Sequence, residues 1–384
     1  MGAPDADDAD VALRDWAASG AMALTGSFDG PPRAAPGRVA SVVREALAGV
    51  VGGPLPGLLG ERAAYAGLSR NAPWSCGGAF RVVSTADGHL ALSLPRESDL
   101  ALVPALVEQE VGDGEHWPAV ARWAAGRTSD EAEERVRLLG LPGGAVPERP
   151  PSDRPGVVTT HLGHRTVAER PLVVDLTSLW AGPLCAHLLG LRGARVIKVE
   201  SVSRPDGARR GPADFFRLLH AGHEMLSLDL VAESETLRSL VAEADLVLEA
   251  SRPRALRRLG LVAEDVVASG TSWLSITAQG RGSDAVGFGD DVAVSAGLWV
   301  RDGADVVPVG DALADPLSGA TAAAHAVAAL GSEQAGLVDL SMRHVAAEAA
   351  VGQVAEHDVM LREGRWWVES ASGTFPVADP ARRP

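Results

Sequence analysis

The sequence has little of what several classes of protein require. Its two cysteines, Cys76 and Cys185, lie far apart, and no C-x-x-C pair or histidine cluster has the spacing of a metal site. No apolar run approaches the length of a membrane span. The formal charge of −15 would repel nucleic acid and anionic membranes. With no signal peptide recognisable, the sequence indicates a protein of the reducing cytoplasm with no metal, nucleic-acid or membrane partner.

What the chain does have is enough apolar residues for a large core. Its 384 residues are 46% hydrophobic, with few aromatics, so two or three domains are expected. A Pro- and Gly-rich stretch at 143–155 is the clearest linker. We therefore divide the chain into a helical segment at 1–57, a small domain at 58–150 and a large domain at 151–384.

Strands alternate with helices through the large domain, which favours an α/β fold. The clearest unit begins with an apolar strand at 172–176, turns at Ala181-Gly182-Pro183, and continues as a leucine-rich helix and a strand at 195–199. Pro183 suits the first helical position. Such a βαβ unit predicts a parallel sheet with ligands at its carboxyl edge, and no G-x-G-x-x-G indicates a dinucleotide.

Other segments give shorter signals. Residues 80–84 and 89–94 flank Asp87-Gly88 as a predicted hairpin. Residues 98–110 and 129–139 are predicted helices, the second with Ser129 as N-cap. A final long helix is expected at 345–361.

The central unit resembles the opening of the class III CoA-transferases, the group of formyl-CoA and carnitine CoA-transferases and α-methylacyl-CoA racemases. Asp175, Ala181-Gly182-Pro183, Gly193-Ala194 and Val196 to Glu200 match in order and spacing. The resemblance implies a Rossmann-like parallel-sheet domain with a smaller α+β domain, acyl-CoA as substrate without a further cofactor, and an interlocked homodimer. The order of segments is rearranged, because 11–145 resemble the part that comes later in family members.

Asp315 is the leading candidate for chemistry. From the residues alone, an Asp before Pro at a helix start is an ordinary N-cap whose carboxylate stays ionised at neutral pH. The family's nucleophilic aspartate stands in Asp-x-x-Ser/Thr-Gly, which Asp315 to Gly319 match. The resemblance therefore implies that Asp315 is a covalent nucleophile, with Asp311 as the nearby competitor.

The resemblance also implies a set of substrate- or CoA-binding positions, each with an ordinary structural explanation beside it. The glycine pair could supply N–H donors to an oxyanion or form a plain loop, and the charged residues could bind CoA or lie in solvent. These positions are Trp180, Ala181, Lys198, Arg258, Asp290, Gly77 and Gly78.

The sequence supports three functions. The first is an acyl-CoA:carboxylate CoA-transferase that works through an aspartyl-CoA thioester. The second is a racemase or isomerase of an α-branched acyl-CoA, which needs two acid–base groups. Racemases of the family carry a His in the segment that matches 287–291, and no His stands between His223 and His325. The third is a CoA-binding homologue without turnover.

Overall fold

The computed structural model describes residues 6–383, apart from 56, 252 and 304. A sheet of seven strands forms its centre, in the order β4-β12-β9-β8-β5-β6-β7. All neighbours pair in parallel except β4, which runs antiparallel to β12 at one edge. The strands are β4 (Val157–His164), β5 (Leu172–Asp175), β6 (Arg195–Ser201), β7 (Glu224–Leu228), β8 (Leu246–Glu249), β9 (Ser272–Thr277) and β12 (Gln334–Ser341).

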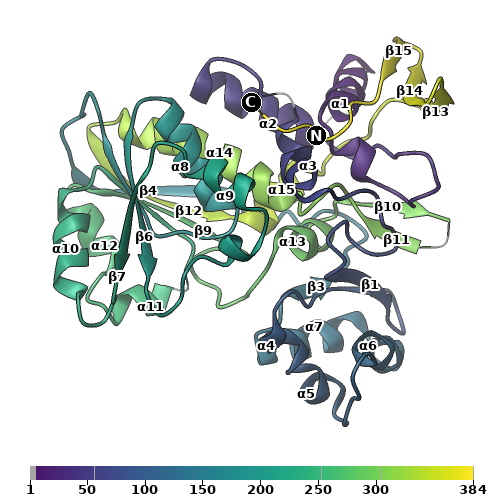
Figure 1. The fold of residues 1–384 in the computed structure, drawn as a ribbon, viewed down its shortest axis with the longest axis horizontal. Coiled ribbons are helices and arrows are strands. Elements are labelled where there is room, and N and C mark those ends of the chain that lie inside the picture. The colour runs from purple at the N-terminus through teal and green to yellow at the C-terminus, as the bar shows by residue number, and fades with distance from the viewer. Residues whose placement is uncertain (1–5, 56, 252, 304, 384) are drawn as a thin grey trace.

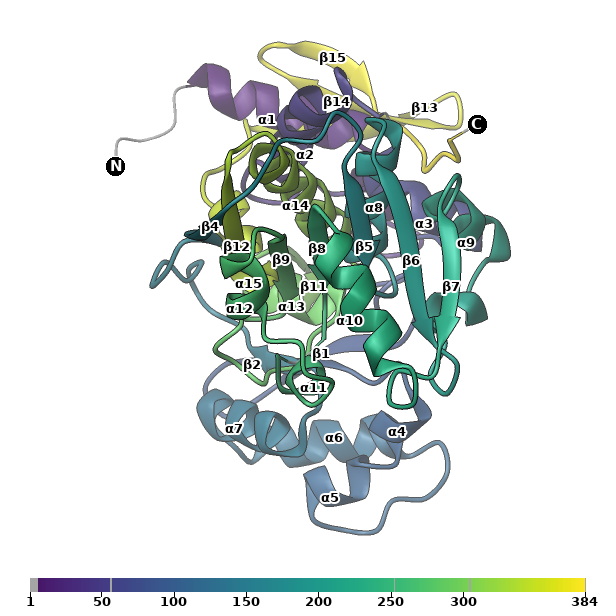
Figure 2. The same cartoon turned by 90° about the vertical axis from the view of Figure 1, so that its left-hand side faces the viewer.

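Helices cover both faces of this sheet, because successive strand residues point to opposite sides. Val173 joins a core with α8 and α14, whereas Val174 joins a second core with α10 and α12. In Figure 2, α10 and α12 lie on the side nearer the viewer. The helices of the large domain are α8 (Ala181–Leu191), α9 (Ala213–Leu219), α10 (Ser234–Glu243), α11 (Pro253–Arg257), α12 (Ala263–Ala268), α13 (Gly289–Ser295), α14 (Ala314–Leu330) and α15 (Met342–Ala349). The predicted α/β class and mostly parallel sheet are confirmed.

A smaller α+β unit lies below the seven-stranded sheet and its helices in Figure 1. Its antiparallel sheet has the order β1-β2-β3, and its helices enclose a separate core around Leu90 and Val120. The elements are β1 (Phe80–Ser84), β2 (His89–Ser93), β3 (Gly143–Ala145), α4 (Glu97–Leu100), α5 (Val103–Val107), α6 (His116–Ala125) and α7 (Ser129–Leu139). The hairpin predicted around Asp87-Gly88 is confirmed.

The two ends of the chain meet on the large domain. Helix α2 (Val39–Val51) contributes Val43 and Leu47 to the same core as α8 and α14, and α3 (Glu61–Ala66) follows it. Helix α1 (Ala6–Ala18) packs against the terminal sheet of β13 (His357–Arg362), β14 (Arg365–Ser370) and β15 (Gly373–Pro376). A hairpin of β10 (Trp299–Asp302) and β11 (Asp305–Pro308) completes the fold. The segment 1–57 is thus integrated with the large domain, although the proposed boundaries themselves stay a prediction.

Several local predictions are wrong, each for a physical reason. The expected linker begins with a strand, β3, and the helix expected at 345–361 ends at Ala349, before Gly352 with φ of +108°. The helix expected at 98–110 is two short helices, α4 and α5, with Pro104 at the start of the second. Thr128, not Ser129, caps α7, because its hydroxyl accepts from the Glu131 amide. Pro183 is the third residue of α8, not the first.

No helix in the described part of the chain is both long and apolar enough to cross a membrane.

Candidate active site

Asp315 lies where the first turn of α14 meets the first turn of α13. Helix α14 begins at Ala314, and the Asp315 amide donates to the Ala312 carbonyl at 2.9 Å, so Asp315 is its second residue rather than its cap. The Asp315 carboxylate accepts a hydrogen bond from the Gly289 amide. A Cβ at Gly289 would lie 2.5 Å from Asp315 Oδ2, which explains the glycine there. As a whole residue, Asp315 is half-buried.

Two further carboxyl groups surround Asp315. Asp290 Oδ1 accepts from the Ala312 amide at 2.8 Å, and its carboxyl also bonds the Ser75 side chain. Asp311 is fully buried and ion-paired with Arg62 from α3. The structure therefore brings together Asp315, its competitor Asp311 and the predicted Asp290.

Burial raises the pKa values of these three carboxyls. The pKa of Asp315 is raised to about 7, chiefly by burial and also by the negative charges of Asp290 and Asp311, against the lowering effect of the Arg62 charge. Burial is also the main reason why the pKa of Asp290 is raised to about 6. Burial also raises the pKa of Asp311, against the charge and hydrogen bond of Arg62. The expectation that Asp315 is fully ionised at neutral pH is thus wrong.

Arg62 is the residue of this site that the sequence did not single out. Its guanidinium lies 5.4 Å from the ring centroid of Trp180, the residue just before α8, and its side chain is 30% exposed. Trp180 is buried and packs edge-on against Phe215, with ring centroids 5.6 Å apart. No sequence pattern separates Arg62 from other helical arginines, because its partner Asp311 is 249 residues away.

The glycines of the predicted motifs play different structural roles. A Cβ at Gly319 would lie 2.7 Å from the Ala181 carbonyl, so this glycine lets α14 cross the start of α8 closely. Gly77 and Gly78 are exposed in the loop before β1, whose Cys76 Sγ lies 3.3 Å from the Gly310 carbonyl. The Gly78 amide donates within that loop to Ser75 at 2.9 Å, which leaves Gly77 as the candidate donor.

Two predicted CoA contacts do not reach this site. Lys198 Nζ is fully buried, 3.3 Å from Asp206 and 3.6 Å from Asp175, and also donates to the Thr177 carbonyl. In this structure it neutralises buried carboxylates, and its part in CoA binding stays a prediction. Arg258 is exposed in the turn after α11, next to the core on the other face of the sheet from α14.

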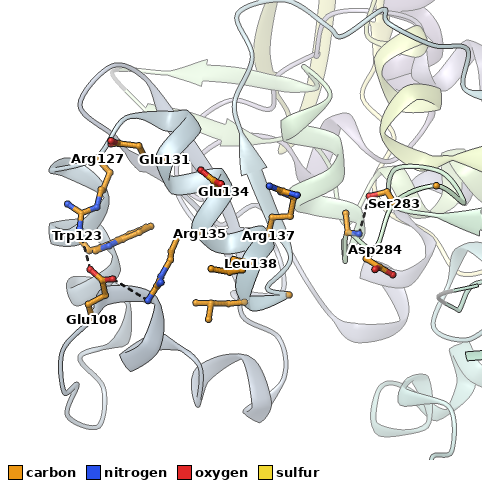
Figure 3. A pocket seen from close by; sticks show the side chains of 14 residues that line it. Glu108, Trp123, Arg127, Glu131, Glu134, Arg135, Arg137, Leu138, Ser283 and Asp284 are labelled. Carbon is orange, nitrogen blue, oxygen red and sulfur yellow. Dashed lines mark hydrogen bonds and ion pairs between the residues drawn. The ribbon is translucent and has the colours of Figure 1, made fainter. Parts of the chain in front are cut away.

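A cavity of about 880 Å³ has none of Asp290, Asp311 and Asp315 in its lining, so it is separate from the acid cluster. It lies between the small domain and the loop at 282–285, as Figure 3 shows. On the side of the small unit, Glu108 pairs with Arg127 at 3.5 Å and with Arg135 at 3.4 Å. Two of the three arginines that line the cavity are therefore paired with a carboxylate. Within the described residues, no group of three or more His, Cys, Asp or Glu is arranged to hold a metal ion.

Known proteins resemble this chain over its second half. Residues 171–378 match the profile of CoA-transferase family III. Succinyl-CoA–D-citramalate CoA-transferase of Chloroflexus aurantiacus is 31% identical over 186 residues, which are 43% of this chain and 46% of that protein. Formyl-CoA:oxalate CoA-transferase of Escherichia coli is 31% identical over 103 residues, 24% and 25% of the two chains. A crystal structure of Rv3272 from M. tuberculosis shares 26% identity, with a TM-score of 0.46 over 54% of this chain and 64% of that one. The matched segments thus span less than half of these two curated relatives.

Proposed function

Because this chain belongs to CoA-transferase family III, we propose that it moves CoA from an acyl-CoA to a small carboxylic acid, with Asp315 as the nucleophile. The observation that carries the proposal is the position of Asp315. It is a half-buried aspartate at the junction of α13 and α14, in the sequence Asp-x-x-Ser-Gly, with two further carboxyls and Arg62 near it.

In the first half of the proposed reaction, a carboxylate oxygen of Asp315 attacks the thioester carbonyl. The carbon–sulfur bond breaks, CoA thiolate leaves, and a mixed anhydride remains. The thiolate then attacks the Asp315 carbonyl carbon, the donor acid leaves as its carboxylate, and an aspartyl-CoA thioester forms.

The second half reverses these events with a new acid. The incoming carboxylate attacks the aspartyl carbonyl and releases the thiolate, which then attacks the new acyl carbonyl and regenerates the Asp315 carboxylate. No proton is consumed overall. Each step develops an oxyanion that needs N–H donors, and Gly77, exposed in the neighbouring loop, is our candidate.

Trapping of the activated carboxyl tests the proposal. The protein is incubated with succinyl-CoA and with other acyl-CoAs, hydroxylamine is added, and peptides are mapped by mass spectrometry. A hydroxamate on Asp315 that disappears in Asp315→Asn and persists in Asp305→Asn, an exposed control on β11, is the expected result. A hydroxamate on Asp311 or Asp290 would keep the reaction class and reassign the nucleophile.

The second candidate function is an α-branched acyl-CoA racemase, which needs two acid–base groups. The Asp290 carboxyl and the Asp315 amide both bond Ala312, which brings two carboxyls close together, and their raised pKa values, about 6 and about 7, suit proton transfer. Deuterium uptake at the substrate α-carbon in D₂O, without a hydroxamate, would support this alternative. Binding of acyl-CoA with neither signal would support the non-catalytic homologue. The homodimer and the cytoplasmic location stay predictions.

A further inference from the structure

Arg62 has hydrogen-bonding capacity that its described contacts do not use. Its Nη2 donates to Asp311, whereas its Nε is buried without a partner. The indole Nε1 of the neighbouring Trp180 is also a buried donor without a partner. Unpaired buried donors are costly, and they are explained most simply when a ligand supplies the acceptors.

The charges of the site indicate which kind of ligand would supply these acceptors. Asp290, Asp311 and Asp315 are all acidic, and Arg62 is the cation that acts on each of them. An incoming carboxylate would be repelled by this group unless a cation met it. A guanidinium offers the paired N–H donors that fit a carboxylate, and 30% of the Arg62 side chain remains exposed for that contact.

We propose that Arg62 binds the carboxylate of the incoming acid and holds it beside Asp315. This inference rests on the proposed transferase function. Arg62 stays charged and gives up no proton; it positions the oxygen that attacks the aspartyl thioester. The cation–π contact with Trp180 and the hydrogen bond to Asp311 position the guanidinium.

The site is then completed by a part of the chain outside the family match. Arg62 stands on α3, and the match covers 171–378. The second half of the chain supplies the nucleophile, and the first half supplies the contact that selects an acid. A purely structural counter-ion of Asp311 would instead leave the binding of acids unaffected once Asp311 was neutralised.

Binding of succinate to the full chain tests the assignment without requiring turnover. Titration calorimetry is run on the wild type, Arg62→Gln, Arg62→Lys and Arg33→Gln. Arg33 is the matched control, a partly exposed arginine paired with Asp302 at 2.7 Å and not with the acid cluster. We expect succinate to bind at least tenfold more weakly to Arg62→Gln and within twofold of wild type to Arg33→Gln. Arg62→Lys keeps the charge without the fork and should be intermediate.

The double variant Arg62→Gln/Asp311→Asn separates the two roles. Persistent weak binding of succinate supports the acid-binding role, and recovery to the wild-type level would overturn it. Unchanged binding in Arg62→Gln, or no binding to the wild type at tens of millimolar, would also overturn it. The hydroxamate at Asp315 reports separately on the transferase. If the hydroxamate forms but succinate binding does not depend on Arg62, only the role of Arg62 is refuted. If succinate binding depends on Arg62 but no hydroxamate forms, only the transferase function is refuted.

Discussion

The pH dependence of Asp315 is the sharpest consequence of its surroundings. Only the ionised carboxylate attacks a thioester, and its pKa is raised from 3.8 to about 7. Ionisation at pH 6 would then be about 10%, against about 90% at pH 8, so adduct formation should be roughly tenfold slower at pH 6. An aspartate with its ordinary pKa would be fully ionised at both and would show a flat profile.

Substitution of neighbouring charges should move this profile in opposite directions. The negative charge of Asp290 raises the pKa of Asp315, so Asp290→Asn should lower that pKa and reduce the loss of rate at pH 6. Arg62 lowers the pKa of Asp315, so Arg62→Gln should raise it and deepen the loss. The two shifts have opposite signs because one change removes an anion and the other a cation.

The assay is the single-turnover rate of hydroxamate formation at Asp315, with saturating succinyl-CoA, between pH 5.5 and 8.5. Saturation separates the ionisation of the enzyme from changes in acyl-CoA binding. A rate that is constant across this range in the wild type would refute the raised pKa. Shifts of the same sign in both variants would refute the charge argument while leaving the nucleophile in place.

Three other changes test the packing and charge of the interior. Gly289→Ala should abolish adduct formation while the chain still folds, because the new methyl group would overlap the Ala312 carbonyl and displace Asp315; adduct yield and circular dichroism check both parts. Lys198→Met should lower the free energy of unfolding in urea by about 3–5 kcal/mol, because two buried carboxylates lose their cation, whereas Arg195→Met breaks a surface pair and should cost about 1 kcal/mol or less. Burial raises the pKa of Asp291 to about 7, so the folded state holds a proton that the unfolded state loses above pH 4, and stability falls as pH rises toward 7. Asp291→Asn should make that decline shallower in melts from pH 5 to 8, because Asp290, Asp311 and Asp315 still contribute to it, and an unchanged slope would contradict this assignment.

The sequence predicted the centre of the fold well, because there the pattern is local. Short apolar runs predict β5 and β6, a leucine-rich segment predicts α8 between them, and Gly182 and Gly193 mark the turns. The edge strand β4 was missed because it is largely exposed and polar, and only its pairing with β12 makes it a strand. Strand β3 was missed because glycines weaken a strand signal. Gly143 is nevertheless needed there, because a Cβ would lie 2.6 Å from the carbonyl of Ala91 on the neighbouring strand.

The site was predictable to the extent that it is contiguous. Asp290, Asp311 and Asp315 lie within one stretch of the chain, and the family resemblance marks it. Arg62 comes from a distant segment, and its importance depends on a tertiary contact with Asp311. The burial of Lys198 could not be read from its strand, because a lysine is normally solvated unless buried carboxylates, here Asp175 and Asp206, pair with it.

The wrong expectation for the ionisation of Asp315 shows which electrostatic effect dominates. A helix N-terminus stabilises a carboxylate by about 0.3–1 kcal/mol and at most about 2 kcal/mol, which lowers its pKa by at most about 1.5 units. Burial and two neighbouring carboxyls raise its pKa to about 7 from 3.8, a difference on the order of 4 kcal/mol. The helix therefore cannot keep this nucleophile ionised by itself. An anionic acid entering the site would raise the pKa of Asp315 again unless a cation met it, so the charge of Arg62 serves the nucleophile and the incoming acid together.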